Sequence, residues 1–255
     1  MNPANAMIRA AIVTFLGVLL AANGVAQAPP VGSVSGVARF EGAVPDREFR
    51  DNEGNARPLL QVNKDGQGLA SVVAYLEPLE NKTPPPSRTT ATNRSPVHIQ
   101  QEDFEFVPRV VALRPGQKVA IGSSDLANHN VHSLAKNPEN AFNVMTPYDK
   151  AYQRNIHPEP DGRPIRLTCD LHPWMTAWIY TFEHDHFAVS DDQGRFTIQR
   201  VRPGRYRLIL EQPDGPLNAQ AELVVHEREI IRVSVTFNEE NLGNRQPGKI
   251  EVSRK

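Results

Sequence analysis

Short apolar segments of strand length, separated by glycine and proline turns, run along almost the whole chain. Residues 34–40, 69–76, 109–113 and 206–210 are such segments, and Pro115-Gly116 and Pro203-Gly204 are two of the turns. In residues 177–182, Trp178, Tyr180 and Phe182 alternate with Ala177 and Ile179, the period-2 pattern of a strand. No long segment shows the 3.6-residue period of an amphipathic helix. The fold class is therefore predicted to be all-β, a sandwich or barrel.

The first 28 residues have the pattern of an export signal. Arg9 is their one charge, residues 10–22 are apolar, and Ala26-Gln27-Ala28 is a small-x-small cleavage sequence. The apolar run is shorter than the ~20 residues of a membrane span. We expect a cleaved signal peptide over 1–28, no membrane span afterwards and a periplasmic or secreted protein; a retained N-terminal anchor is the alternative.

Charge and motifs exclude several function classes. The formal net charge is −1, which argues against nucleic acid or an anionic membrane as a partner. No Ser-His-Asp arrangement, paired-carboxylate signature or phosphate loop stands out in the sequence. The chain is therefore not expected to be an enzyme.

The single cysteine lies in the segment Cys169-Asp-Leu-His172-Pro-Trp-Met175. An unpaired cysteine in an exported protein forms an intermolecular bridge, stays a reactive thiol or binds a metal. Thiolate, imidazole and thioether together favour copper, held by two histidines, a cysteine and a weak axial methionine. A further histidine must then come from elsewhere. Residues 125–132 offer His129 and His132, which on a strand would point to opposite sides, so only one can reach the site.

Residues 104–182 resemble a cupredoxin. The resemblance is carried by Pro108 to Gly116, by His129-Asn130-Val131, and by the short Cys169–Met175 loop, which is similar to that of the amicyanins. It implies a Greek-key sandwich with one type 1 copper ion held by His129, Cys169, His172 and Met175. It also implies that Asn130 ties the two ligand loops together and that His132 is not a ligand. His172 would be the electron's exit, beside a docking patch of Pro173 and Trp174, with Met145, Pro147 and Tyr148 as weaker members.

The flanking segments resemble a carboxypeptidase regulatory-like, transthyretin-like β-sandwich. Gly32-Ser-Val-Ser-Gly-Val37 and residues 72–76 match its opening, and residues 186–210 match its later strands. The predicted organisation is a signal peptide (1–28), N-terminal strands with a Pro-rich linker (29–96), an inserted cupredoxin domain (97–183), C-terminal strands (184–238) and a polar, frayed tail (239–255). Together the two resemblances point to exported plastocyanin-like or methylamine-utilisation proteins.

Three functions are compatible with these features. The first is an electron carrier that exchanges electrons with a redox protein such as a cytochrome or dehydrogenase. The second is a copper carrier or buffer without electron transfer, and the third is an interaction module whose cupredoxin domain has lost its metal. Two further expectations concern structure: His184 and His186 are assigned to a solvated strand end, and residues 137–164 mainly to a long loop, which could hold a short helix.

Overall fold

The computed structural model describes residues 30–80 and 94–254. Within these residues the regular elements are strands and two short 3-10 helices, which confirms the all-β prediction. No helix among the described residues is long and apolar enough to cross a membrane. The predicted signal peptide and most of the Pro-rich linker lie outside the described residues.

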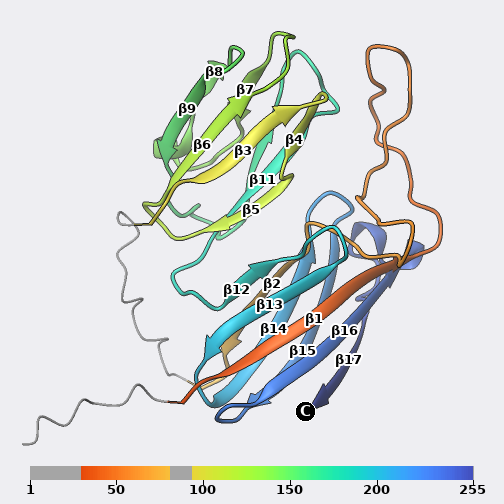
Figure 1. The fold of residues 1–255 in the computed structure, drawn as a ribbon, viewed down its shortest axis with the longest axis vertical. Helices are drawn as coiled ribbons and strands as arrows, with labels where there is room; N and C mark the ends of the chain where they lie inside the picture. The colour runs from red at the N-terminus through yellow and green to blue at the C-terminus, as the bar shows by residue number, and fades with distance from the viewer. Residues whose placement is uncertain (1–29, 81–93, 255) are drawn as a thin grey trace, which may run out of the picture.

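The described residues form two β-sandwiches (Figure 1). The first sandwich has one sheet in the order β13-β1-β16-β17 and a second in the order β12-β2-β14-β15. Its strands are β1 (Gly32–Glu41), β2 (Val73–Pro78), β12 (Phe187–Val189), β13 (Arg195–Val201), β14 (Gly204–Gln212), β15 (Leu217–Val225), β16 (Ile230–Asn238) and β17 (Lys249–Arg254). Buried and half-buried residues alternate along β1, because successive side chains point to opposite faces of a sheet.

The second sandwich is inserted between β2 and β12. Its sheets have the orders β5-β11-β10-β7-β8 and β4-β3-β6-β9. The strands are β3 (Val97–Glu102), β4 (Glu105–Val107), β5 (Val110–Leu113), β6 (Lys118–Ser123), β7 (Asn130–Ser133), β8 (Asn143–Met145), β9 (Ala151–Asn155), β10 (Ile165–Thr168) and β11 (Thr176–Thr181). Its core is formed by residues such as Ile99, Phe106, Ile121, Leu167 and Ile179.

The first sandwich is therefore built from both ends of the described chain. β1 lies between β13, to which it is antiparallel, and β16, to which it is parallel. Gly36 of β1 is needed for this packing, because a Cβ there would lie 2.4 Å from the ring of Phe196. The likeness of this sandwich to a transthyretin-like fold stays a prediction.

An apolar seam joins the two sandwiches. Val73 and Tyr75 of the first sandwich pack with Val110, Tyr180 and Phe182 of the second. The predicted two faces of β11 account for this: Ala177 and Ile179 enter the core of the second sandwich, while the alternate side chains enter the seam.

Charged groups are buried beside this seam. Asp214 of the first sandwich accepts hydrogen bonds from Arg109 at 3.2 Å and from the indole nitrogen of Trp178 at 2.8 Å. The side chains of Arg109 and Asp214 are 3% and 5% exposed. The seam is thus a specific interface between the two sandwiches, with buried polar contacts beside its apolar residues.

Two predicted loops contain ordered structure. Residues 137–164 hold the 3-10 helix η2 (Pro138–Asn140) and the strands β8 and β9. Asn140 is fully buried, and its amide nitrogen donates to the His157 carbonyl at 2.9 Å and to the Glu159 carboxylate at 2.8 Å. Its side-chain oxygen accepts the His157 N–H at 2.9 Å, so this one side chain satisfies both backbone groups of His157. The short helix is thus present as a 3-10 turn, whereas β8 and β9 contradict the assignment of this segment mainly to loop.

The prediction of a frayed tail is also wrong for residues 239–254. The 3-10 helix η3 (Glu239–Asn244) begins with a capping box on its N-cap residue, Asn238, and β17 pairs with β16. β17 is polar because it is an edge strand with mostly exposed side chains.

Candidate metal centre

Three predicted ligands meet at one end of the second sandwich. His129 immediately precedes β7, whereas Cys169 and His172 lie in the loop between β10 and β11. The Cys169 sulfur is 3.9 Å from Nδ1 of His129 and 3.5 Å from Nδ1 of His172, and the two nitrogens are 3.1 Å apart. All three side chains are buried. Residues 40 positions apart in the chain are therefore brought into one small triangle.

This triangle fits a metal ion. A point equidistant from the corners of a triangle with these sides lies about 2 Å from each atom, close to the 2.0–2.3 Å bonds that imidazole nitrogen and thiolate sulfur form with zinc. A thiolate with two imidazoles is a soft-to-borderline donor set, which suits copper. The donor atoms therefore match a bound ion in both spacing and chemistry.

The spacing Cys-x₂-His-x₂-Met folds the ligand loop into two successive turns. The backbone N–H of His172 donates to the Cys169 carbonyl at 3.3 Å, and that of Met175 donates to the His172 carbonyl at 2.9 Å. A hydrogen bond from the Cys169 N–H to the Met175 carbonyl, at 3.4 Å, closes the base of the loop. Met175 is fully buried in the same core, and its role as the fourth ligand stays a prediction.

Asp125 orients His129. Its carboxylate lies 2.8 Å from Nε2 of His129 and accepts the backbone N–H groups of Asp103 at 2.8 Å and Phe104 at 3.0 Å. A carboxylate at Nε2 favours the proton on that nitrogen and leaves Nδ1 free to bind a metal. No separate sequence pattern indicates this role, beyond the position of Asp125 four residues before the ligand.

The same carboxylate stabilises an unusual hairpin between β3 and β4. Asp103 and Phe104 both have positive φ values, 51° and 59°, which are uncommon for residues other than glycine. The turn places the Phe104 ring edge-on to His172, with centroids 4.9 Å apart, and to His129, at 5.4 Å. An aromatic cover over both imidazoles results, and it was not anticipated from the sequence.

Asn130 joins the two ligand segments, as predicted. Its side-chain oxygen accepts the backbone N–H of Asp170 at 2.8 Å and the thiol of Cys169 at 3.3 Å. Its amide nitrogen donates to Asp170 at 2.9 Å and to Asn143 at 2.8 Å. Asn130, which follows the ligand His129, is thus hydrogen-bonded to Cys169 and Asp170 of the other loop, and these bonds fix the separation of the two loops.

His172 is the most accessible of the three, at 7% exposure against 1% for Cys169 and 0% for His129. Burial, followed by the neighbouring His129, lowers the pKa of His172, while Asp125 opposes this shift. A lowered pKa keeps the imidazole neutral at neutral pH, the form that binds metal ions.

Trp174 does not belong to the surface around His172. It is 4% exposed, and its indole N–H donates to the Phe104 carbonyl at 3.1 Å. The predicted docking role of Trp174 is wrong because the indole faces inward. Leu126, Leu171, Met145 and Tyr148 are exposed apolar side chains in this sandwich, and Pro173 is exposed beside His172.

The remaining histidines lie outside the cluster. His132 is placed apart from it, as predicted, with Nδ1 2.9 Å from Asp170. His184 and His186 lie in the segment between β11 and β12, with ring centroids 5.9 Å apart. His186 is only 7% exposed and packs edge-on against Tyr206, so the assignment of this pair to a solvated strand end is wrong.

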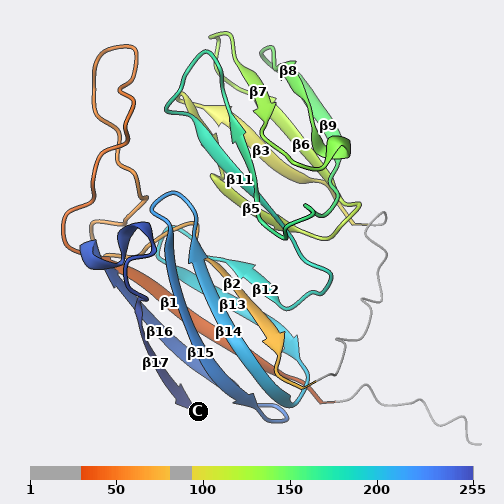
Figure 2. The same ribbon diagram turned by 180° about the vertical axis from the view of Figure 1, so that it is seen from behind.

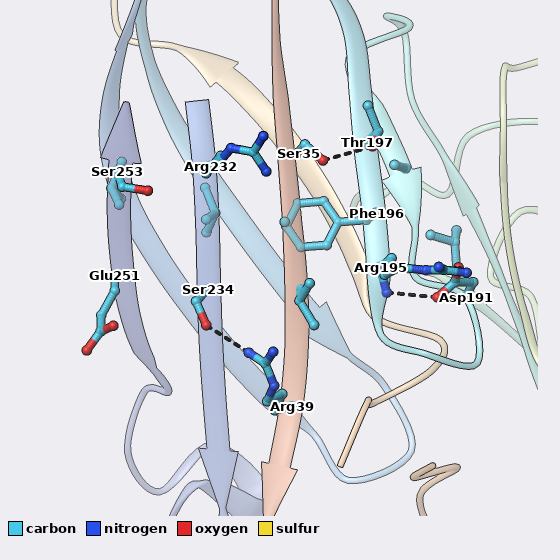
Figure 3. A pocket seen from close by; sticks show the side chains of 16 residues that line it. Ser35, Arg39, Asp191, Arg195, Phe196, Thr197, Arg232, Ser234, Glu251 and Ser253 are labelled. Atoms are coloured by element: carbon cyan, nitrogen blue, oxygen red, sulfur yellow. Dashed lines mark hydrogen bonds and ion pairs between the residues drawn. The ribbon is translucent and has the colours of Figure 1, made fainter. Parts of the chain in front are cut away.

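A separate groove of about 960 Å³ lies on the first sandwich (Figure 3). Figure 3 shows its polar side chains arrayed across β13, β1, β16 and β17. Arg39 donates to Ser234 at 3.1 Å, and Arg195 donates to Asp191 at 2.9 Å. These groups bind one another, and no histidine or cysteine lines the groove. The candidate site is therefore the buried cluster.

Similarity to known proteins covers only part of the chain. No protein-family model matches it, and no curated protein is similar enough to count as a relative. Amicyanin from Paracoccus versutus is 18% identical, over 42% of this chain and 98% of that protein, with a TM-score of 0.30. A purple cupredoxin from Nitrosopumilus maritimus is 16% identical, over 34% and 99%, with a TM-score of 0.29.

A copper-containing nitrite reductase from Thermus scotoductus is 18% identical over 42% of this chain, with a TM-score of 0.32. The match covers only 28% of that enzyme. At these identities and scores, the description of the site rests on its own geometry.

That geometry defines a class. The second sandwich has two facing sheets, one histidine before β7, and a cysteine and a histidine in the β10–β11 loop, all converging at one end. The fold is cupredoxin-like, and the donor atoms of its cluster form a set that suits copper.

Proposed function

We propose that this protein is an exported electron carrier with one type 1 copper ion. His129, Cys169 and His172 would bind the ion, and Met175 would be the weak axial ligand. The observation that carries the proposal is the buried triangle of two nitrogens and one sulfur, with an equidistant point about 2 Å from each atom. Bound copper would supply one-electron chemistry, alternating between Cu(I) and Cu(II).

The protein's own part is to hold the donor atoms still. Asp125 fixes one imidazole, Asn130 fixes the spacing of the ligand loops, and two turns fix the Cys169–Met175 loop. Such a preorganised set of ligands need not rearrange when an electron arrives or leaves. Burial of all three side chains excludes water, which would otherwise offer an additional ligand.

An electron would enter and leave near His172, the most accessible ligand. The exposed Leu171 and Pro173 flank it in the chain and supply an apolar surface. Weak redox encounters use small interfaces, so a patch of this kind is sufficient. The partner is proposed to be a redox protein, such as a cytochrome or dehydrogenase, in the periplasm or outside the cell.

The test is the visible spectrum of the purified protein after addition of Cu(II). We expect an intense thiolate-to-copper absorption that is lost in Cys169→Ser and kept in His132→Ala, a matched change at a histidine outside the cluster. A colourless wild type with a reactive thiol would overturn the proposal. Reversible voltammetry then distinguishes an electron carrier from a copper buffer, which would be oxidised and reduced slowly.

A further inference from the structure

The first sandwich reaches the ligand loop through the segment between β1 and β2. In both overall views this segment rises from the end of β1 and stands beside the second sandwich (Figures 1 and 2). Its stem is hairpin-like, because the Arg47 N–H donates to the Arg57 carbonyl at 2.8 Å and the Leu59 N–H donates to the Pro45 carbonyl at 2.8 Å. We call residues 43–59 the arm.

Arg47 of the arm contacts three parts of the molecule. Nε donates to the Pro58 carbonyl within the arm at 3.3 Å, and one terminal nitrogen forms an ion pair with Glu105 of β4 at 3.1 Å. The other terminal nitrogen donates to the backbone carbonyl of Trp174. The side chain is 6% exposed, so these bonds are made away from water.

Trp174 lies between two of the proposed copper ligands, His172 and Met175. Its indole N–H is bound to the Phe104 carbonyl of its own sandwich, and its backbone carbonyl is bound to Arg47 of the other sandwich. Trp174, which lies in the second turn of the ligand loop, is therefore held by one hydrogen bond to each sandwich.

The arm also touches the hairpin that covers the imidazoles. Arg57 donates to the Asp103 carbonyl at 3.2 Å and lies 3.6 Å from Glu105. Asp103 in turn donates its backbone N–H to Asp125, which orients His129. Both ligand segments are thus connected to the arm through short chains of hydrogen bonds.

We propose that Arg47 is a positioning residue for the metal centre, through which the first sandwich holds the ligand loop of the second. Burying a guanidinium is costly unless its charge is paired and its N–H groups are hydrogen-bonded. Arg47 forms an ion pair with Glu105 and donates hydrogen bonds to the carbonyls of Pro58 and Trp174. An interface between sandwiches alone would be served by the apolar seam. This proposal rests on the proposed function where copper binding is measured, but not where the reactivity of the Cys169 thiol is measured in the metal-free protein.

The experiment compares three variants of the full chain. Arg47→Met keeps the length of the side chain but removes its donors, Arg47→Lys keeps the charge without the forked geometry, and Arg50→Met is the matched control. Arg50 lies in the same arm but is exposed and donates only to Gly54. Near-ultraviolet circular dichroism checks that each variant is folded.

The first readout needs no metal. In the metal-free protein, Cys169 is 1% exposed and should react slowly with a thiol reagent. We expect Arg47→Met to react at least about tenfold faster, because a charge-assisted hydrogen bond no longer holds the loop closed. Arg47→Lys should be intermediate, and Arg50→Met should match the wild type.

The second readout is copper binding. Removing a group that orients metal ligands typically costs about 10- to 100-fold in affinity, so we expect a loss of that size in Arg47→Met, with a shifted thiolate-to-copper absorption. Equal thiol reactivity and equal copper affinity in Arg47→Met and Arg50→Met would overturn the inference and leave the proposed function standing. Faster thiol reactivity in Arg47→Met, with no copper band in the wild type, would support the positioning role and overturn the proposed function.

Discussion

The two sandwiches differ in what their cores contain. The core of the first is made of aliphatic and aromatic side chains such as Phe40, Leu76, Leu208 and Phe237, with no cysteine or methionine among its buried members. The core of the second includes Cys169, Trp174 and Met175 and ends against two buried histidines. The hydrophobic core of the first sandwich contains no sulfur side chain, whereas that of the second contains Cys169 and ends at the cluster of candidate ligands.

This difference shows how the polar cluster is tolerated. Unpartnered buried polar groups are destabilising, and here the imidazoles, the carboxylate of Asp125 and the amide of Asn130 satisfy one another. The first sandwich adds Asp214 at the seam and Arg47 at the ligand loop. The apolar unit thus acts as a frame for the unit that carries the chemistry.

Breaking the seam should have the largest effect. Asp214→Ala leaves the Trp178 indole without its acceptor and removes the nearest carboxylate of the buried Arg109, which keeps only Glu105 at 3.5 Å and the Leu59 carbonyl at 2.8 Å. Removing one member of a buried pair costs up to about 3–5 kcal/mol of unfolding free energy. Chemical denaturation measures this loss. Glu222→Ala is the control, because the Arg205–Glu222 pair is 56% and 60% exposed and should contribute about 0–1 kcal/mol. Equal effects of the two changes would show that the seam does not hold the sandwiches together.

Copper should stabilise one sandwich more than the other. At a free copper concentration a hundredfold above Kd, binding adds about 2.7 kcal/mol to the folded state. The two tryptophans of the chain, Trp174 and Trp178, both belong to the second sandwich, so their fluorescence reports its unfolding together with the opening of the seam at Trp178, whereas circular dichroism reports both sandwiches. We expect a larger copper-dependent shift by fluorescence. Identical shifts would mean that the sandwiches unfold as a single unit.

Asp125→Asn should weaken the metal centre without disturbing the first sandwich. The amide cannot replace a carboxylate that accepts from Nε2 of His129 and from two backbone N–H groups at once. Changes of this kind cost about 10- to 100-fold in metal affinity. Competition with a chelator measures the loss, and an unchanged affinity would remove Asp125 from the site.

A smaller effect is expected at the histidines between the sandwiches. Burial, then His186 and Arg114, lower the pKa of His184 from 6.5 to about 4, with Asp185 opposing. Between these two values the unfolded chain binds more protons, so this contribution to stability is complete above pH 6.5 and is lost as pH falls toward 4. Unfolding midpoints between pH 4 and 7 should therefore vary less in His184→Gln than in the wild type. Parallel curves would contradict the assignment.

Much of the fold could be predicted because its strands are long or strongly patterned. The segment 165–168 coincides with β10, and the two faces of β11 were evident from its alternating aromatic residues. The missed strands β8, β9 and β17 are short or polar edge strands, whose pairing depends on a neighbour and not on their own apolar pattern.

The candidate site could be predicted where its signal was local. Cys169, His172 and Asn130 lie in recognisable short motifs, and the structure places them together with His129. The inward orientation of Trp174 and the contact from Arg47 had no local signal, because each depends on a backbone carbonyl far away in the chain. Hydrogen bonds to the backbone leave no trace in the partner's residue type.

The parallel pairing of β1 with β16 determines the order in which the molecule can be completed. Ser33 lies opposite Ile230, so the strand made early by the ribosome waits for one made near the end. Every strand of the inserted sandwich is synthesised in the interval, and its contacts are closer in sequence. Pairings between distant segments form slowly because a long loop must close first. The inserted sandwich, which carries the candidate metal centre, can therefore close before the β1–β16 pairing completes the first sandwich.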